Sequence, residues 1–300
     1  MKKIPNINSK TINPSKISNA KKRRLLRLGK KQLNNSSITK IENSIITPQK
    51  VPFNQPPSPI MTSKTLHDLY KEYTLFHAET ANQLPNFLKK FWKQRYNLFS
   101  KYDEGIFLDQ ESWYSVTPEP IAQHIALTCK HKIVIDAFCG SGGNAIQFAL
   151  HCDKAFDLTI LNINTTLKVI AIDIDPQKIF IAQNNARVYN VLHKIDFICG
   201  DFLKIADTLF ADVVFLSPPW GGVGYISEPV YSLSMIQPID GVELFNKAKS
   251  ISESVIYFLP KNTSLEEIVD LSNGKKCKIE QNYLYNSLKS ITFYYNVQNF

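Results

Sequence analysis

The spacing of hydrophobic positions along the chain changes near residue 131. Upstream of it, apolar and aromatic side chains recur at helical intervals, and those from Leu84 to Phe99 predict one amphipathic helix with an aromatic face. Downstream, short and nearly continuous apolar runs alternate with helical stretches, as in parallel sheets covered by helices on both faces. The runs that predict strands are residues 132–139, 168–175, 195–201, 211–217 and 254–259.

This alternation predicts an α/β fold with a mostly parallel sheet. Two alternating runs, residues 277–285 and 290–297, predict an antiparallel hairpin at one edge of that sheet. Further upstream, Thr117-Pro118 predicts the start of a helix with Thr117 as its N-cap. The other helices are expected at residues 144–150, 176–189, 203–210, 240–251 and 264–271.

Composition divides the chain into three parts. Residues 1–63 are rich in Asn, Ser, Lys and Pro and cannot bury enough apolar surface, so we expect a disordered basic tail and a proline-rich linker. Residues 64–130 are expected to form a helical N-terminal extension, and residues 131–300 to form the α/β domain.

The positive charge of the chain belongs to the tail. The net charge is +9, but residues 1–60 hold 13 basic side chains and one acidic one, whereas residues 61–300 hold 22 basic and 25 acidic. The basic run at residues 21–31 is typical of a nuclear localisation signal or an RNA-backbone contact, and also of a tail that only keeps the protein in solution.

Several classes of protein are disfavoured. No apolar run reaches the ~18 residues of a membrane span, and the first residues do not resemble a secretory signal. The five cysteines are widely spaced without a C-x-x-C pair, which predicts reduced thiols inside a cell rather than disulfides. The six histidines form no ligand cluster, so no metal site is expected.

A glycine-rich turn follows the first predicted strand. It runs from Asp136 to Asn144 as DAFCGSGGN, and such a turn lets the backbone approach a ligand closely. A dinucleotide fingerprint would need a third glycine where Ala145 stands, which disfavours a dehydrogenase. An acid inside the strand suits the ammonium group of S-adenosylmethionine, although an ordinary strand–helix turn remains the plain alternative.

Acids also end the next two predicted strands. Asp173 is placed to accept the hydroxyls of an adenosine ribose, while Asp175 is more plausible as the cap of the following helix. Asp201 is placed to bind the adenine amino group, with Phe202 packing on the base, although an acid there is often only a helix cap. Three acids at the carboxyl ends of successive strands favour one shared ligand site.

The motif Ser217-Pro218-Pro219-Trp220-Gly221-Gly222 follows the fourth predicted strand and resembles the Asp/Asn/Ser-Pro-Pro-aromatic signature of amine methyltransferases. The Ser217 hydroxyl and the Pro218 carbonyl can hold an exocyclic amine, and Trp220 supplies a stacking face. An indole stacks best on a cationic ring, which favours 7-methylguanine, although tryptophan also stacks on neutral bases. The plain alternative is a rigid loop before a glycine turn.

With these motifs the chain resembles the trimethylguanosine synthase family over roughly residues 90–261. The resemblance also rests on FWKQRYNLFS at residues 91–100, YDEGI at 102–106, SVTPE at 115–119 and the Asn184-Asn185-Ala186 triplet. It implies a class I methyltransferase with a Rossmann-like, mostly parallel seven-stranded sheet. It further implies two methyl transfers from S-adenosylmethionine to the 2-amino group of a 7-methylguanosine cap.

The same resemblance assigns roles to single residues. Ser217, Pro218 and Trp220 match the catalytic motif, while Lys90 and Lys261 match basic positions expected at the cap phosphates. Lys261 replaces an arginine of some relatives, so it offers a point charge instead of a fork. The residues that it places at the cofactor are Phe99, Thr117, Asp136, Cys139, Gly140, Asn144, Asp173, Ile174, Asp201 and Phe202.

The resemblance also implies partners and a location. We expect capped small nuclear and nucleolar RNAs as substrates, proteins of their particles as partners, and a nuclear and nucleolar location for a monomer. Two alternatives stay open, namely a methyltransferase for an amine of another RNA, such as a ribosomal guanine or an adenine, and a non-catalytic cap-binding module. Also open are the RNAs modified, the processivity of the two steps and the role of the insertion at residues 151–166.

Overall fold

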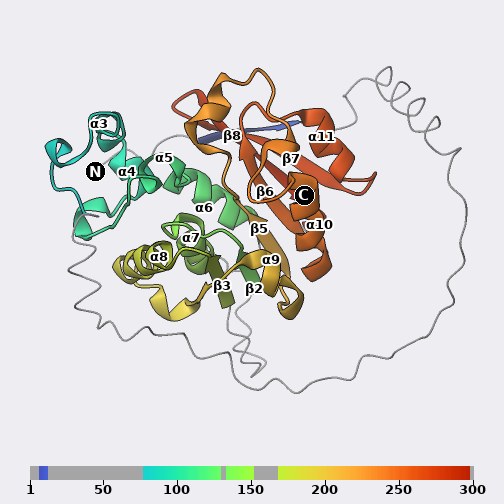
Figure 1. The fold of residues 1–300 in the computed structure, drawn as a ribbon, viewed down its shortest axis with the longest axis horizontal. Helices are drawn as coiled ribbons and strands as arrows, with labels where there is room; N and C mark the ends of the chain where they lie inside the picture. Colours follow the sequence, from blue (N-terminus) through green and yellow to red (C-terminus); the bar gives the residue numbers. More distant parts are fainter. Residues whose placement is uncertain (1–6, 13–76, 130–132, 152–167, 298–300) are drawn as a thin grey trace, which may run out of the picture. The chain divides into compact units, whose positions relative to one another are not determined.

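An eight-stranded mixed sheet forms the centre of the protein (Figure 1). The structure is a computed structural model that describes residues 7–12, 77–129, 133–151 and 168–297. The strand order is β1-β7-β8-β6-β5-β2-β3-β4, with parallel pairing from β6 to β4 and antiparallel pairing among β6, β8, β7 and β1. The strands are β1 Ile7–Ile12, β2 Ile133–Asp136, β3 Lys168–Asp173, β4 Ile195–Cys199, β5 Val213–Leu216, β6 Val255–Pro260, β7 Cys277–Leu284 and β8 Ser287–Tyr295.

The five predicted parallel strands and the C-terminal hairpin are confirmed in place and direction. β5 and β6 are buried at every position, because helices cover both faces of the sheet. The hairpin enters the sheet through its second strand, since β8 lies between β6 and β7. The helices of four residues or more are α3 Lys89–Trp92, α4 Arg95–Leu98, α5 Ser112–Ser115, α6 Glu119–Thr128, α7 Gly143–His151, α8 Pro176–Val188, α9 Phe202–Ile205, α10 Gly241–Ile251 and α11 Leu265–Leu271.

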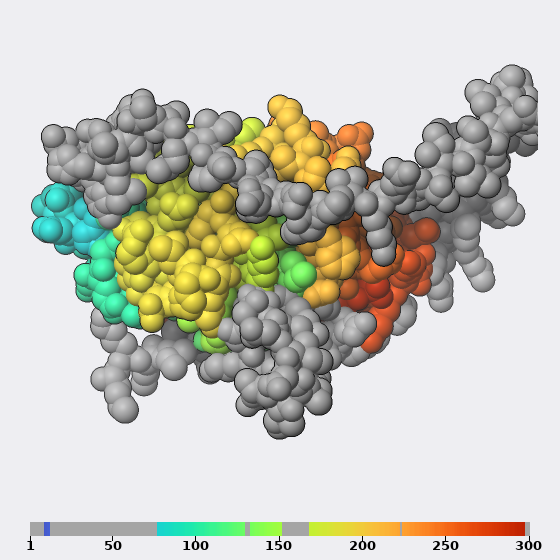
Figure 2. Space-filling model, turned by 90° about the horizontal axis from the view of Figure 1, so that it is seen from below, coloured from blue at the N-terminus to red at the C-terminus, as the bar shows by residue number. Residues whose placement is uncertain are grey.

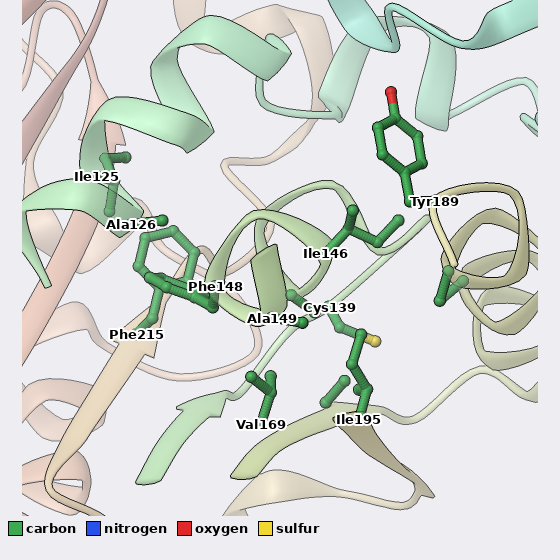
Figure 3. Close-up of a cluster of buried hydrophobic side chains, with 14 of the residues drawn as sticks. Ile125, Ala126, Cys139, Ile146, Phe148, Ala149, Val169, Tyr189, Ile195 and Phe215 are labelled. Carbon is green, nitrogen blue, oxygen red and sulfur yellow. The ribbon is translucent and has the colours of Figure 1, made fainter. Parts of the chain in front are cut away.

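Two hydrophobic clusters lie on the two faces of the sheet. Successive residues of β2 alternate between them, with Val134 in the cluster under α6, α7 and α8 and Ile135 in the cluster under α9, α10 and α11. Figure 3 shows the first cluster, where Phe148 of α7 meets Phe215 of β5 edge to face at 5.4 Å. The two clusters hold the carboxyl edge of the parallel strands in a fixed place.

The single aromatic helix predicted from Leu84 to Phe99 is wrong. The segment forms two short helices, α3 and α4, separated at Lys93 and Gln94. Its aromatic residues pack around Tyr102 instead of along one stripe, with the Trp92 ring edge-on to Tyr102 at 5.6 Å. Figure 2 shows the cyan and green residues of the extension beside the yellow residues of α8 and the segment after it.

Thr117 is not the N-cap of α6, contrary to the prediction. The N-cap is Pro118, whose position has no side-chain capping bond, and the first turn contains Pro120. The Thr117 hydroxyl instead accepts a hydrogen bond from Asn144 Nδ2 of α7 at 2.9 Å. A tertiary partner has therefore displaced the local capping interaction.

The predicted disorder of residues 1–63 is wrong for residues 7–12. They form β1, which pairs antiparallel with β7 from Ile7 opposite Leu284 to Ile12 opposite Ile279, and so adds an eighth strand to the seven expected. Pairing through the backbone needs no apolar run, and Ile12 packs partly against the second cluster. The rest of the tail, its basic run and the predicted insertion after His151 lie outside the described residues.

Candidate active site at the carboxyl edge of the sheet

The glycine-rich turn joins β2 to α7 with little room for side chains. Gly140 and Gly142 have φ angles of +51° and +86°, which only glycine adopts at low cost. A Cβ atom on Gly143 would lie 2.8 Å from Val116 Cγ2, so the turn touches the N-terminal extension. The turn is thus formed jointly by the α/β part and the extension.

Asp136, at the end of β2, is fully buried and points into this region. Neither carboxylate oxygen has a hydrogen-bond partner among the described residues. Burial raises the pKa of Asp136 to about 7, and the nearby Asp173 carboxylate adds to this rise. The backbone amides of Phe138 and Ala145 lower the pKa in part, although neither meets the geometry of a hydrogen bond. A buried, unpartnered carboxylate of this kind suits a cationic ligand.

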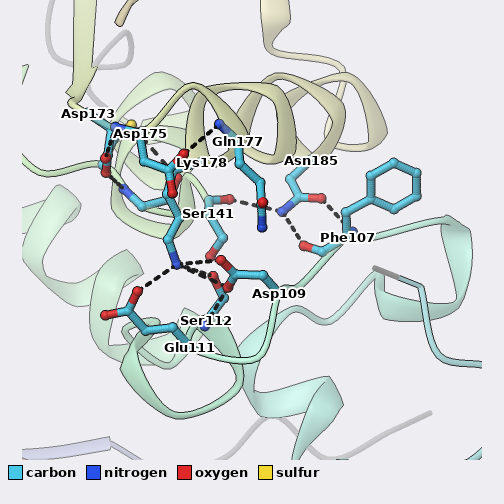
Figure 4. Close-up of polar contacts among 12 residues, drawn as sticks. Phe107, Asp109, Glu111, Ser112, Ser141, Asp173, Asp175, Gln177, Lys178 and Asn185 are labelled. Atoms are coloured by element: carbon cyan, nitrogen blue, oxygen red, sulfur yellow. Dashed lines mark hydrogen bonds and ion pairs between the residues drawn. The ribbon is translucent and has the colours of Figure 1, made fainter. Parts of the chain in front are cut away.

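Asp173 closes the other side of the turn (Figure 4). One carboxylate oxygen accepts the Gly140 amide at 2.9 Å and the other accepts the Asp175 amide at 3.0 Å. Burial raises the pKa of Asp173, and the two amides oppose this rise. Asp175 accepts the Gln177 amide at 2.8 Å, so the prediction that it caps α8 is confirmed.

Asp201 and Phe202 lie where the next strand ends. Asp201 is the N-cap of α9, accepting the Leu203 amide at 3.0 Å, and its carboxylate lies 3.5 Å from the Lys204 ammonium. The Phe202 ring is buried 5.9 Å from the Phe138 ring. The structure therefore gives Asp201 the capping role considered beside the ligand role in the sequence.

The segment Ser217-Pro218-Pro219-Trp220 after β5, which we call the proline corner, lies against the glycine turn. Ser217 Oγ donates to the Phe138 carbonyl at 3.2 Å, one residue before Cys139. The Pro218 carbonyl accepts no hydrogen bond from any described residue. A hydroxyl has one proton and two lone pairs, so Ser217 keeps its accepting capacity free at this position.

Trp220 is partly buried between the two hydrophobic clusters. Its ring is edge-on to Tyr225 at 5.3 Å and inclined by 31° to Phe258 at 5.5 Å, and its indole N–H is buried without a partner in the described part of the chain. Asn262 holds the following loop by donating to the carbonyls of Tyr225 and Glu228 at 3.1 and 2.8 Å. Packing thus fixes the indole in place, while its N–H forms no hydrogen bond with any described residue.

Two residues of the extension reach the same turn. The Phe99 ring lies 3.9 Å from the Cβ position of Gly143, and the Thr117 hydroxyl is bonded to Asn144. Asn144 Oδ1 is buried without a partner among the described residues. The structure therefore brings these residues together with Asp136, Cys139, Gly140, Asp173 and Ser217. Their role in binding the cofactor stays a prediction.

Other predicted site residues are not brought into contact with this group. In the described part of the chain, the Lys90 ammonium lies 5.0 Å from the Phe91 ring and forms no ion pair, and Lys261 is exposed directly after β6. Ile174 is exposed, with its carbonyl accepting a weak bond from Cys199 Sγ. Lys90 and Lys261 remain predictions.

Sequence reasoning missed a buried lysine beside the site. The Lys178 ammonium of α8 lies 2.7 Å from Asp109 and 3.1 Å from Glu111, and 3.3 Å from Ser112 Oγ (Figure 4). Burial works against the charged lysine, but the two carboxylates outweigh it and raise the pKa of Lys178. This ion-paired group, which we call the Lys178 clasp, ties the extension to the first turn of α8.

A second contact between the extension and the α/β part is made by Asn185, which the sequence marked only as part of the Asn184-Asn185-Ala186 triplet. Asn185 donates to the carbonyls of Phe107 and Ser141, each at 2.9 Å, and accepts the Phe107 amide at 2.8 Å. Its amide therefore bridges the extension and the glycine turn. Ser141 Oγ is itself buried without a partner among the described residues, a feature that no sequence pattern reveals.

Comparison with known proteins places the chain in a family. The RNA cap guanine-N2 methyltransferase family matches residues 131–298. This chain belongs to that family. A trimethylguanosine synthase of Schizosaccharomyces pombe is 40% identical over 226 residues, which are 72% of this chain and 88% of the relative. A trimethylguanosine synthase of Saccharomyces cerevisiae is 32% identical over 222 residues, or 68% of this chain and 66% of the relative.

Solved structures agree on the fold. A structure described as a methyltransferase of Porphyromonas gingivalis W83 superposes with a TM-score of 0.50 at 12% identity, covering 77% of this chain and 58% of the other. The cap methyltransferase therefore has the Rossmann-like class I fold, and its methyl donor is S-adenosylmethionine. In the described residues, no helix is long and apolar enough to cross a membrane, and no group of three potential metal ligands occurs.

The site of this cap methyltransferase fits its cofactor. Asp136 offers a buried carboxylate that no described residue pairs with, which suits the ammonium group of S-adenosylmethionine. The cofactor's carboxylate suits the backbone amides of the glycine turn, where α7 begins at Gly143. Burial raises the pKa of the Cys139 thiol, so this neighbour stays uncharged.

Proposed function

We propose that the protein converts 7-methylguanosine caps to 2,2,7-trimethylguanosine by two successive methyl transfers to the exocyclic 2-amino group. The observation that carries this proposal is the Ser217–Phe138 hydrogen bond, which fixes the amine-binding corner against the cofactor turn. The family match and the two relatives named trimethylguanosine synthase support it.

In this proposal the chain acts by positioning. Asp136 holds the ammonium group of the cofactor, Asp173 its ribose hydroxyls, and Phe99 and Thr117 complete the pocket from the extension. Phe202 packs on the adenine, while Asp201 binds its amino group with the lone pairs left by the helix cap. S-adenosylmethionine supplies an electrophilic methyl group on its sulfonium.

The proline corner orients the amine. The Ser217 hydroxyl donates its proton to the Phe138 carbonyl, so the lone pairs of the Ser217 oxygen can accept one amine N–H. The Pro218 carbonyl accepts the other amine N–H. The Trp220 indole stacks on the cationic base and so fixes the plane of the base. With the amine held in this way, its lone pair would face the methyl group. A new N–C bond would replace the S–CH3 bond of the sulfonium and the amine would lose one proton to water, so positioning would supply most of the acceleration.

The finer assignments follow from the same proposal. Lys90 and Lys261 contact the cap phosphates. Capped small nuclear and nucleolar RNAs are the substrates, with proteins of their particles as partners of a monomeric enzyme. These substrates imply a nuclear location, and within it the nucleolus, and the basic run at residues 21–31 supports a nuclear address.

The test uses purified protein, labelled S-adenosylmethionine and either 7-methyl-GTP or GTP. We expect one and then two methyl groups on 7-methyl-GTP by mass spectrometry, and none on GTP. Ser217→Ala should lower kcat about 100-fold while the Kd for the cofactor changes less than twofold, because one positioning bond is lost. The matched control is Ser227→Ala, whose hydroxyl bonds only locally to Gly224.

Three outcomes would contradict the proposal. Equal methylation of GTP would point to a guanine amine of another RNA, and transfer only to an adenine would point to an adenine amine of another RNA. Cap binding without any transfer, in protein that binds S-adenosylmethionine, would leave only a cap-binding module.

A further inference from the structure

We propose that the region around α3 is a second RNA-binding surface, which takes the single-stranded chain next to the cap. The proposal rests on the proposed function only for the identity of the substrate. We call this region the α3 surface; its residues are Phe87, Lys89, Lys90, Phe91, Lys93 and Tyr114.

Charge is concentrated on the α3 surface. Residues 80–102 contain five basic side chains and no acidic one, although residues 61–300 as a whole carry more acids than bases. Arg95 and Lys101 are paired with Asp103 and Glu104. No acidic side chain in the described part of the chain pairs with Lys89, Lys90 or Lys93, which leaves three positive charges for phosphates.

Exposed aromatic rings lie among these charges. Phe87 is 57% exposed and Tyr114 is 38% exposed, whereas their neighbours Leu88 and Trp113 are buried. The Phe91 and Tyr114 rings lie 6.4 Å apart, and the Lys90 ammonium lies 5.0 Å from the Phe91 ring. Exposed rings interleaved with ammonium groups are the features by which proteins bind single-stranded RNA, through base stacking and phosphate contacts.

The α3 surface is close to the site along the chain. It is separated from Phe99 by α4, a helix of four residues that rises only about 6 Å. Tyr114 lies in α5, directly before the segment that carries Thr117. Asn97 of α4 accepts a hydrogen bond from Tyr285 at 2.9 Å, so the connecting helix is held in place.

The experiment compares a capped dinucleotide with a capped, unstructured RNA of about 15 nucleotides. The variant is Phe87→Ala/Lys93→Ala, which leaves the proposed cap contact Lys90 in place. Wild-type protein should have a KM for the longer RNA at least tenfold lower than for the dinucleotide. In the double variant, the KM for the longer RNA should be about tenfold higher than in the wild type, with kcat and the KM for the dinucleotide unchanged.

Salt dependence gives a second readout. For the uncapped 15-mer, measured by fluorescence anisotropy, the slope of log K against log salt should be smaller by about 0.7 in the variant, because one phosphate contact is lost. The matched control is Phe210→Ala/Lys275→Ala, a 69% exposed ring and an exposed lysine outside the α3 surface, which should leave both readouts unchanged.

Three outcomes decide the matter. Equal KM values for the two substrates, or an unchanged RNA preference in the Phe87/Lys93 variant, would overturn the proposal and leave the α3 surface to a protein partner. A loss of RNA affinity with a normal thermal unfolding curve would support it. The anisotropy assay needs no methyl transfer, so it tests this surface even if the proposed reaction fails.

Discussion

At the level of single residues, the site depends on polar groups that are buried without partners. Asp136, Ser141, Asn144 and the indole of Trp220 each have at least one such atom, and each costs free energy to leave unpaired. Among the described residues, these four lie at the glycine turn and the proline corner, whereas Asn282 and Tyr295 have such atoms in the C-terminal hairpin. A ligand that satisfies these groups would therefore also stabilise the folded protein.

The first prediction concerns the pH dependence of cofactor affinity. Binding an ammonium group requires the ionised form of Asp136, whose pKa in the free protein is raised to about 7. The association constant for S-adenosylmethionine should therefore rise by up to tenfold per pH unit from pH 5.5 to 7 and level off above. Calorimetric titration across this range measures it.

Asp136→Asn provides the control. The variant should bind more weakly at pH 7.5 and show a flatter profile, with the remaining slope belonging to Asp173, whose pKa is also raised by burial. An unchanged profile in the variant would show that Asp136 does not hold the cofactor.

The second prediction concerns Trp220. Trp220→Ala should raise the KM for 7-methyl-GTP by about 5- to 150-fold, which corresponds to the loss of one stacking contact, and Trp220→Phe should have a smaller effect. The Kd for S-adenosylmethionine should change less than twofold, since the ring packs against Tyr225 and Phe258 and not the glycine turn. Equal KM values for wild type and Trp220→Ala would remove the indole from the cap site.

At the level of elements, the extension is fastened to α8 at several points. Asn184 donates to the Gly105 carbonyl at 2.8 Å, and Tyr189 donates to Glu119 at 2.6 Å while Glu119 also accepts from the Ser100 amide. The Lys178 clasp adds an ion pair that is shielded from water. The short helices of the extension are therefore held by α8 more than by their own hydrogen bonds.

The third prediction tests the clasp. Lys178→Met should lower the free energy of unfolding by about 3 kcal/mol, because it leaves the Asp109 carboxylate buried without its cation. Lys178→Met/Asp109→Leu should recover part of this loss, since both charges are removed. Chemical denaturation measures both.

Lys168→Met is the matched control for this prediction. It breaks the Lys168–Asp196 pair, which lies at 2.6 Å but with both side chains about half exposed, so the loss should stay below about 1 kcal/mol. Equal losses for Lys178→Met and Lys168→Met would show that the clasp contributes nothing beyond a surface ion pair.

Sequence and structure agree where local periodicity decides the outcome. The five parallel strands and α10 were predictable from their apolar pattern, and α8 was predictable because its pattern and its Asp175 cap point to the same element. The extension was not, because its aromatic rings pack around Tyr102, a contact that spacing alone does not reveal.

The site shows the same division. The residues at the ends of β2, β3 and β5 follow from the rule that parallel strands bind ligands at their carboxyl edge. The Thr117–Asn144 bond and the Lys178 clasp were not predictable, because they join segments that are far apart in the sequence. A sequence marks which residues carry chemistry more readily than which residues support them.

At the level of the whole molecule, Glu280 links α6 to the C-terminal hairpin. Its buried carboxylate lies 2.9 Å from His124 Nε2 and 2.6 Å from the Lys278 ammonium. Burial alone would raise the pKa of Glu280, but the hydrogen bonds from His124 and Lys278 outweigh it and hold the pKa at about 2. The charged form is therefore the one that the fold stabilises.

The fourth prediction follows from this shift. A depressed pKa stabilises the folded state above the ordinary glutamate pKa, and the effect is lost as the pH falls from about 4.5 towards 2. Glu280→Gln should lower the free energy of unfolding by about 3 kcal/mol at pH 7 and by about half as much at pH 3. Urea denaturation at both pH values measures it.

The control for this prediction is Glu253→Gln, an exposed acid 3.8 Å from Lys275, which should change stability by less than about 0.5 kcal/mol at either pH. A difference between wild type and Glu280→Gln that does not narrow at pH 3 would show that the carboxylate charge is not the cause.

The pairing of β1 with β7 sets an order for folding during synthesis. Ile7 lies opposite Leu284, so two segments from almost opposite ends of the sequence share one ladder. On a ribosome, β1 emerges first of the described strands and its partner β7 emerges next to last, before β8, because chains are made from the N-terminus. The nascent sheet therefore lacks this edge at first, and β1 can join β7 only when translation is nearly complete.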